Sequence, residues 1–286
     1  MPNLYFILFE LVIYLQLALC LQHAWKQGKA NLLRLLVGIL FGIILELATI
    51  RQLEAYEYGQ FLIMILDVPL CIGVAWGCIL YSVMEFSDAS SLPYWTRPIL
   101  DGLLALNIDL ALDAIAIRLG FWDWGQGLGF QYFGVPYANF WAWFWVIYFF
   151  SFGYRILAQR PDWTGTWLSP FLALTLGLLG VLGTNALIAF KIPFAYHGYT
   201  VAFLLVIAIG IVFALRPAFH VQDIPALSFW VPAITHIYTL IAGVISGHIL
   251  NPPALLFVGL MMVLIAFFLH RQTIQQFLVS ISRSHP

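Results

Sequence analysis

The sequence predicts an all-α integral membrane protein, a bundle of about nine transmembrane helices with eight as the alternative count. Of the 286 residues, 63% are hydrophobic and only 9% are charged, whereas soluble domains carry about 25% charged residues. A mean hydropathy of +0.94 agrees with this class. Long apolar runs are separated by proline, glycine and charged residues. We therefore expect a single transmembrane domain over residues 1–286.

Nine apolar runs supply the expected spans, because a helix needs about 20 residues to cross the hydrocarbon core of a bilayer. Most neighbouring runs are separated by helix breakers such as Pro93, Pro161 and Pro193. Only Pro252 and Pro253 separate the last two runs, which leaves eight spans as the alternative. The first run lacks the basic start of a signal peptide, so we expect it to be retained. The runs cover residues 4–21, 32–50, 61–84, 98–119, 138–157, 167–190, 198–216, 228–250 and 254–270.

The distribution of Lys and Arg favours nine spans over eight. With nine spans, the side that includes the C-terminus holds nine of these residues and the other side holds three. With eight spans the division is seven against five. Because cytoplasmic loops are enriched in Lys and Arg, we expect the N-terminus outside and the C-terminus in the cytoplasm. The expected location is a bacterial cytoplasmic membrane or a thylakoid-type membrane.

Three aspartates lie inside the run 98–119, namely Asp101, Asp109 and Asp113. A carboxylate in hydrocarbon is costly, and its default interpretation is a functional site that faces the protein interior. Asp109 and Asp113 are four residues apart, so they share one face of a helix. One alternative is that protonated aspartates only hold helices together. Another is that Asp101 forms a solvated pair with Arg97.

The predicted topology brings further carboxyl groups to the same part of the membrane. Glu46 lies near the outer end of the second span, and Asp67 in the outer half of the third. Asp109 lies at mid-depth, and Asp113 about 6 Å further out by the rise of the helix. Burial and neighbouring negative charge both favour a protonated carboxyl group. We therefore predict a general acid, or an acid and a base, formed by Glu46, Asp109 and Asp113 in a dry cavity.

The segment 120–145, GFWDWGQGLGFQYFGVPYANFWAWFW, contains the second group of candidate residues. Its tryptophans and tyrosines could form only an interfacial aromatic belt. A belt does not require the glycines and proline, which impose a specific backbone path. Aromatic faces also stabilise cations. The residues expected to line a substrate site are Trp122, Asp123, Trp124, Tyr132, Pro136, Asn139, Trp143, Tyr58 and Asp67.

Metal, haem and nucleic-acid sites receive little support from the sequence. The cysteines at 20, 71 and 78 lie in apolar runs without CxxC spacing, so we expect neither a disulfide nor a metal site. A haem between the seventh and eighth spans, held through His197, is the weaker alternative to hydrogen-bonded core histidines. No basic patch indicates nucleic acid, and membrane lipids are the expected surroundings. We expect no metal and no cofactor.

Five sequence pieces resemble the CruF-type carotenoid biosynthesis family, membrane carotenoid 1,2-hydratases that include bisanhydrobacterioruberin hydratase. The resemblance covers roughly residues 45–160, and its most specific part is the glycine-tryptophan run followed by GVP-x-x-NF. The pieces are Glu46, YEYGQF (56–61), VPLCIGVAW (68–76), NIDLALDAIAIRLGFWDWG (107–125) and YFGVPYANFWAW (132–143).

The resemblance implies an enzyme that adds water across the terminal C1–C2 double bond of an acyclic carotenoid end, of the lycopene or γ-carotene type. Asp113 or Asp109 would then donate the proton, and the other aspartate or Glu46 would orient the water. The lipophilic carotenoid would be the substrate, and other carotenoid-pathway enzymes are conceivable partners. Such a reaction is a hydro-lyase reaction and requires no redox cofactor.

Three other functional classes remain open. Asn107, Asp109 and Asp113 loosely resemble the first Asp-rich motif of UbiA-type intramembrane prenyltransferases, but no second such motif follows the fifth span. A proton-coupled transporter could use intramembrane acids as a relay, although no internal repeat is visible. The last alternative is a non-catalytic membrane partner that holds other carotenoid enzymes.

Overall fold

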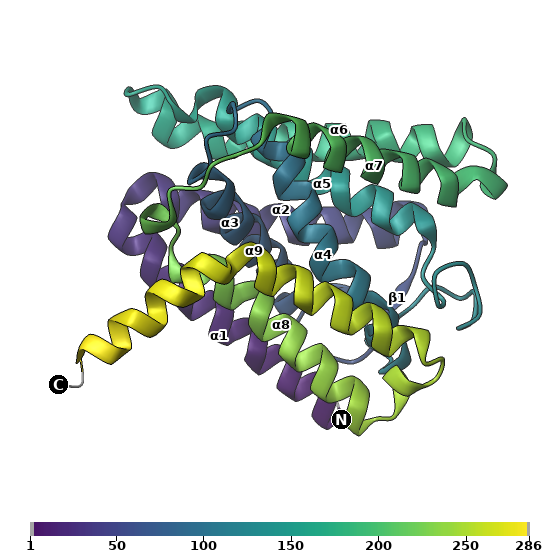
Figure 1. Cartoon of the computed structure of the whole chain (residues 1–286). Helices are drawn as coiled ribbons and strands as arrows, with labels where there is room; N and C mark the ends of the chain where they lie inside the picture. Colours follow the sequence, from purple (N-terminus) through teal and green to yellow (C-terminus); the bar gives the residue numbers. More distant parts are fainter. Residues whose placement is uncertain (1–2, 285–286) are drawn as a thin grey trace.

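The computed structural model describes residues 3–284, without the side chains of residues 52–53 and 276–284. Within this range the chain forms nine long helices, and the predicted all-α polytopic membrane bundle is confirmed (Figure 1). Each predicted run corresponds to one helix. The helices are α1 (Leu4–Gln27), α2 (Lys29–Leu53), α3 (Leu70–Asp88), α4 (Arg97–Arg118), α5 (Tyr137–Ala158), α6 (Ser169–Phe190), α7 (His197–Leu215), α8 (Ala226–Ile245) and α9 (Ala254–Ser284).

Eight of the nine described helices are long and apolar enough to cross a membrane, and the exception is α4. Its 22 residues are long enough for a span, but three aspartates interrupt its apolar character. Most of the residues of α4 are buried by other helices. The aspartates are therefore shielded from lipid, as a helix that carries them through a bilayer requires.

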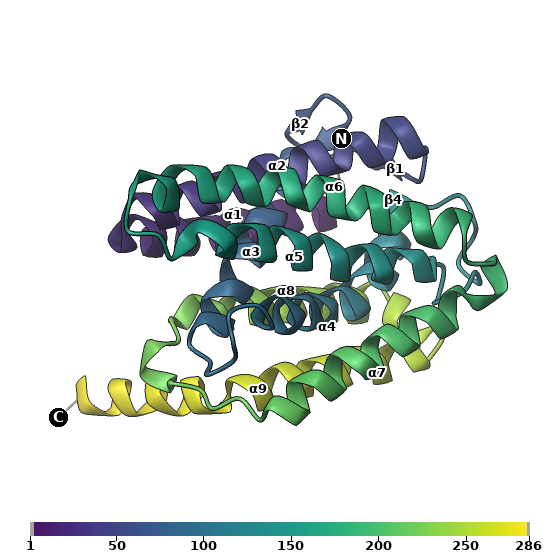
Figure 2. The ribbon, with the colours of Figure 1, turned by 90° about the horizontal axis from the view of Figure 1, so that it is seen from above.

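Helix α4 occupies the middle of the bundle. It contacts α3, α5, α7, α8 and α9, and seen from above it lies with α8 between α5 on one side and α7 and α9 on the other (Figure 2). By contrast, α7 exposes large apolar side chains such as Phe203, Val206 and Phe213. Contiguous apolar surface of this kind is unusual in soluble proteins and suits contact with lipid tails.

The segment before α3 differs from the prediction. Residues 61–69, expected inside the third span, form a small hairpin of β2 (Met64–Ile65) and β3 (Val68–Pro69). Pro69 caps the helix, so α3 begins only at Leu70. Asp67 consequently lies in the hairpin outside the span, where it is half-exposed and accepts a hydrogen bond from Arg51 Nε at 2.7 Å. Its predicted place within the third span is wrong.

A second pair of short strands joins the two aromatic loops, residues 54–69 between α2 and α3 and residues 119–136 between α4 and α5. Strand β1 (Glu57–Tyr58) pairs antiparallel with β4 (Trp122–Asp123), and Tyr58 lies opposite Trp122. The next residue, Gly59, donates its backbone N–H to Phe121 O at 2.9 Å. A Cβ atom at Gly59 would lie 2.4 Å from Gly120 O, so this close approach requires glycine. The pairing fixes Tyr58 and Trp122 relative to each other.

Asp101 does not form the solvated pair with Arg97 that the sequence allowed. Its side chain is fully buried and accepts hydrogen bonds from Arg155 Nη1 at 2.8 Å and Ser151 Oγ at 2.5 Å. Arg97 instead contacts Asp88 at 3.1 Å. The difference arises because Asp101, in the second turn of α4, faces α5, which supplies the buried guanidinium of Arg155. A buried carboxylate of this kind needs a cation close by, so Asp101 is assigned to the packing of α4 against α5.

Candidate functional site

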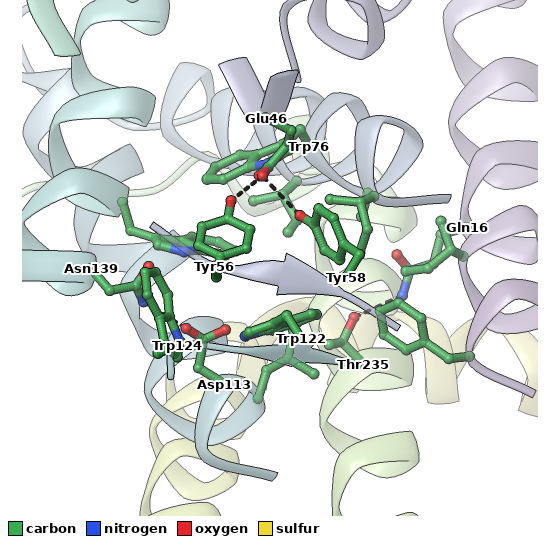
Figure 3. A pocket seen from close by; sticks show the side chains of 17 residues that line it. Gln16, Glu46, Tyr56, Tyr58, Trp76, Asp113, Trp122, Trp124, Asn139 and Thr235 are labelled. Carbon is green, nitrogen blue, oxygen red and sulfur yellow. Dashed lines mark hydrogen bonds between the residues drawn. The ribbon is translucent and has the colours of Figure 1, made fainter. Parts of the chain in front are cut away.

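A cavity of about 600 Å³, including its open mouth, lies where the two aromatic loops meet the ends of several helices (Figure 3). Its walls come from α1, α2, α3, α4, α5 and α8 together with the loops that carry β1 and β4. The cavity is thus formed by the C-terminal ends of α2 and α4 and the N-terminal ends of α3 and α5. The lining residues are Phe9, Ile13, Gln16, Glu46, Tyr56, Tyr58, Ile72, Ala75, Trp76, Ile79, Leu112, Asp113, Trp122, Trp124, Asn139, Trp143 and Thr235.

Glu46 is held in the cavity wall by three hydrogen-bond donors (Figure 3). The hydroxyl groups of Tyr56 and Tyr58 both donate to Oε2, the second at 2.8 Å. The indole Nε1 of Trp76 donates to Oε1 at 2.7 Å. Burial, followed by the charge of Glu46, raises the pKa of both phenols well above its ordinary value, so they stay protonated and remain donors. Three neutral donors on one carboxyl group stabilise its charged form, whereas the burial of Glu46 stabilises its neutral form.

Asp109 and Asp113 form a carboxyl pair that shares one donor. Asn139 Nδ2 donates to Asp109 Oδ2 at 3.2 Å and to Asp113 Oδ2 at 2.6 Å. Both aspartates are at most 2% exposed, and only Asp113 lines the cavity. In the described part of the chain, Asp109 Oδ1 is buried without a hydrogen-bond partner. Two such close carboxyl groups cannot both be charged without a large electrostatic cost.

Aromatic rings cover much of the remaining wall. The rings of Trp76 and Trp143 lie 4.3 Å apart between centroids, and those of Tyr56 and Trp124 lie 4.6 Å apart. Tyr58 contacts Trp122 edge-on at 6.1 Å, as the pairing of β1 with β4 dictates. A cation formed between these rings would meet their electron-rich faces.

Several residues singled out in the sequence lie together in the cavity. These residues are Glu46, Tyr58, Asp113, Trp122, Trp124, Asn139 and Trp143.

Others are placed elsewhere. The Tyr132 hydroxyl donates to Leu110 O at 2.9 Å, and the exposed Asp123 accepts from Gly125 N at 2.8 Å. Pro136 caps the start of α5, and Asp67 pairs with Arg51 outside the cavity. These four residues are not brought to the cavity wall.

The cavity also contains polar residues outside the predicted set, most notably Trp76, Gln16 and Thr235. A signal for Gln16 was present, because it is a polar amide inside the largely apolar run 4–21. Trp76 lies at the end of the family-like piece VPLCIGVAW (68–76), whereas Thr235 carried no signal, since threonine is common in membrane helices.

The histidines of the described part of the chain do not line this cavity. His236 is buried and its Nε2 contacts Asn107 Oδ1 at 3.1 Å, while Asn107 Nδ2 donates to Met262 O at 3.0 Å. His197 Nε2 contacts Ile192 O at 3.2 Å. Among the described residues, His, Cys, Asp and Glu form no group of three or more suited to a metal ion.

Comparison with known proteins identifies the family. The model of a family described as carotenoid biosynthesis protein matches residues 3–213. The match extends well beyond residues 45–160 and covers α1 to α6 and all but the last two residues of α7. No curated protein and no solved structure shows significant similarity. The cavity and its carboxyl groups are built almost entirely from the matched residues, and the chain belongs to the carotenoid biosynthesis protein family.

Proposed function

We propose that this protein is a carotenoid hydratase that adds water across the terminal C1–C2 double bond of an acyclic carotenoid. The observation that carries the proposal is the Asp109–Asp113 pair, which shares the Asn139 amide and opens through Asp113 into an aromatic cavity. Membership in the carotenoid biosynthesis protein family supports a polyene as the ligand.

The first step is protonation of the alkene. An isolated double bond is a weak base, so it requires a carboxylic acid that still holds its proton and is not solvated by bulk water. The buried pair would supply such an acid. The two carboxyl groups share one amide donor, and the repulsion between two charged carboxylates favours a state in which the pair keeps one proton. We assign the donor to Asp113, since it lines the cavity and Asp109 does not. The proton bonds to C2 through the π electrons, which leaves a tertiary cation at C1.

The second step is capture of this cation by water. The rings of Trp122, Trp124 and Tyr58 surround the cavity and stabilise positive charge at C1. Glu46, once ionised, would add a negative charge to the same wall. Water oxygen bonds to C1 and releases one proton to a carboxylate, either Glu46 or the ionised aspartate pair. One water is consumed, and the acid is restored by transfer of the proton within the site.

The cavity lies toward one end of the bundle, which would suit a substrate dissolved in lipid and a co-substrate dissolved in water. From the Lys and Arg distribution, we propose that this end faces outward, with the N-terminus outside and the C-terminus in the cytoplasm. The UbiA-type alternative is less well supported, because the described cavity wall contains no Lys or Arg to bind a diphosphate.

Expression in a host that accumulates an acyclic carotenoid tests the proposal. Mass analysis of the pigments should show a product heavier by one water, and Asp113→Asn should abolish it while the protein stays in the membrane. Asp162→Asn is the matched control, because Asp162 is exposed in the loop before α6. Full product from Asp113→Asn, or no hydrated product from the wild-type protein, contradicts the assignment.

A further inference from the structure

A second polar feature lines the same cavity, on the side opposite Asn139 and Trp124 (Figure 3). Gln16 on α1 is 0% exposed. Its Nε2 donates to Val231 O at 3.2 Å and to Thr235 Oγ1 at 2.8 Å, both on α8. Its Oε1 is buried and has no hydrogen-bond partner among the described residues. A buried acceptor without a donor is destabilising, so this atom requires an explanation.

The orientation of the amide is set by its neighbours. A main-chain carbonyl only accepts hydrogen bonds, so the Gln16 nitrogen must face Val231 O. Exchange of the two amide atoms would place two acceptors against each other. The oxygen is therefore the atom that turns away from α8, and Figure 3 shows it directed toward the interior and Tyr58.

The nearby hydroxyl groups are already committed to other acceptors. Thr235 Oγ1 donates to Val231 O at 3.0 Å, and the Tyr58 hydroxyl donates to Glu46 at 2.8 Å. The rest of this side of the cavity is apolar, with Ile13 and Ile79 in the wall. The donor that satisfies Gln16 Oε1 must therefore belong to a molecule in the cavity.

We propose that Gln16 is a recognition residue whose Oε1 accepts a hydrogen bond from an O–H group bound in the cavity. Two molecules carry this chemistry: the water that adds to the double bond, and a polyene whose end bears a hydroxyl group. The choice of these two molecules rests on the proposed hydration. The observation that Gln16 Oε1 has no partner among the described residues does not depend on that proposal. A hydrocarbon end alone offers no donor, so Gln16 distinguishes oxygenated occupants from purely apolar ones.

The test uses purified full-length protein in lipid nanodiscs. The probes are an acyclic hydrocarbon carotenoid and the same carotenoid with one tertiary hydroxyl at its end, and binding is followed by quenching of tryptophan fluorescence. The variant is Gln16→Met, which keeps length and apolar volume but removes the acceptor. The control is Tyr238→Phe, which removes another α1–α8 hydrogen bond, from the Tyr238 hydroxyl to Tyr5 O at 2.7 Å. The hydration rate is measured on the same samples.

If the polyene hydroxyl is the donor, Gln16→Met should lose about two- to tenfold in affinity for the hydroxylated probe and nothing for the hydrocarbon. If water is the donor, kcat for hydration should fall by a similar factor at unchanged KM. Unchanged values in both arms overturn the inference, as does a Tyr238→Phe variant that reproduces every change. A wild-type protein that hydrates neither probe defeats the proposed function, while the binding arm still decides the role of Gln16.

Thermal unfolding decides whether Gln16→Met remains intact. If it unfolds at a lower temperature than Tyr238→Phe, Gln16→Asn replaces it, because the shorter side chain keeps the amide but withdraws the acceptor by about 1.5 Å, one C–C bond length. The same selective loss is expected from this variant. Wild-type affinity and rate in Gln16→Asn would contradict the proposal.

Discussion

Replacing Gly59 by alanine should destabilise the pairing of β1 with β4, which holds Tyr58 and Trp122 in the cavity wall. The new Cβ would lie 2.4 Å from Gly120 O and 2.8 Å from the Phe6 ring. Since a backbone oxygen cannot rotate away as a side chain can, β1 must move from β4. Overpacking costs roughly 1–3 kcal/mol, and losing the bond from Gly59 N to Phe121 O adds about 1 kcal/mol. The expected loss of stability is therefore roughly 2–4 kcal/mol.

The matched control is Gly129→Ala. Gly129 lies in the other aromatic loop, where a Cβ would meet no atom within 4 Å. Thermal unfolding of the detergent-solubilised proteins gives the stability difference, and hydrated pigment measures the effect on the site. Because Tyr58 and Trp122 are held by the same pairing, Gly59→Ala should lower both quantities and Gly129→Ala neither. Equal stability of the two variants would show that the pairing of β1 with β4 is not tight.

Three further substitutions test the site and the bundle. Asn139→Leu removes the only amide shared by the two aspartates in the described chain, and the hydration rate should fall at least about tenfold. Trp76→Phe keeps a ring beside Trp143 but removes the 2.7 Å bond to Glu46, so kcat should fall by about two- to tenfold with little change in unfolding temperature. Arg155→Leu leaves Asp101 buried without its cation, and the free energy of unfolding in a denaturant titration should drop by about 3–5 kcal/mol; an unchanged value would assign Asp101 another partner.

The positions of the helices could be predicted because membrane spans depend on local properties, namely length and apolar composition. The exception is instructive. Residues 61–66 read FLIMIL, which is as apolar as any span, yet they lie in the hairpin before α3. The start of α3 is decided by Pro69, which is restricted to the first positions of a helix. Hydropathy alone does not register this restriction.

The meeting of Glu46 with Asp113 was also predictable, because alternating helix directions place both residues at the same end of the bundle. The sequence could not predict which of the carboxyl groups is paired with a cation. Asp101 shares a helix with Asp109 and Asp113, but only Asp101 faces Arg155 on α5. Side-chain partners across a helix interface depend on the rotation and packing of both helices. For the same reason, the sequence could not show that Gln16 bonds to α8, because this hydrogen bond joins residues more than 200 positions apart.

These carboxyl groups lie in two environments, one beside arginines and one in the cavity. This division is the feature that most closely links the fold to chemistry. Near the other ends of α3 and α4, Asp88 and Asp101 contact Arg34, Arg97 and Arg155, so their charges are balanced and they stabilise packing. In the cavity, Asp113 and Glu46 meet only neutral donors among their described hydrogen-bond partners. An arginine beside a carboxyl group lowers its pKa and favours the ionised form near neutral pH, which holds no proton to donate to an alkene. In the proposed mechanism, the absence of a cation beside the described Asp109–Asp113 pair is what permits proton transfer to a hydrocarbon. Introducing one, by Leu112→Arg in the cavity wall, should therefore abolish hydration even if the variant folds and binds the polyene.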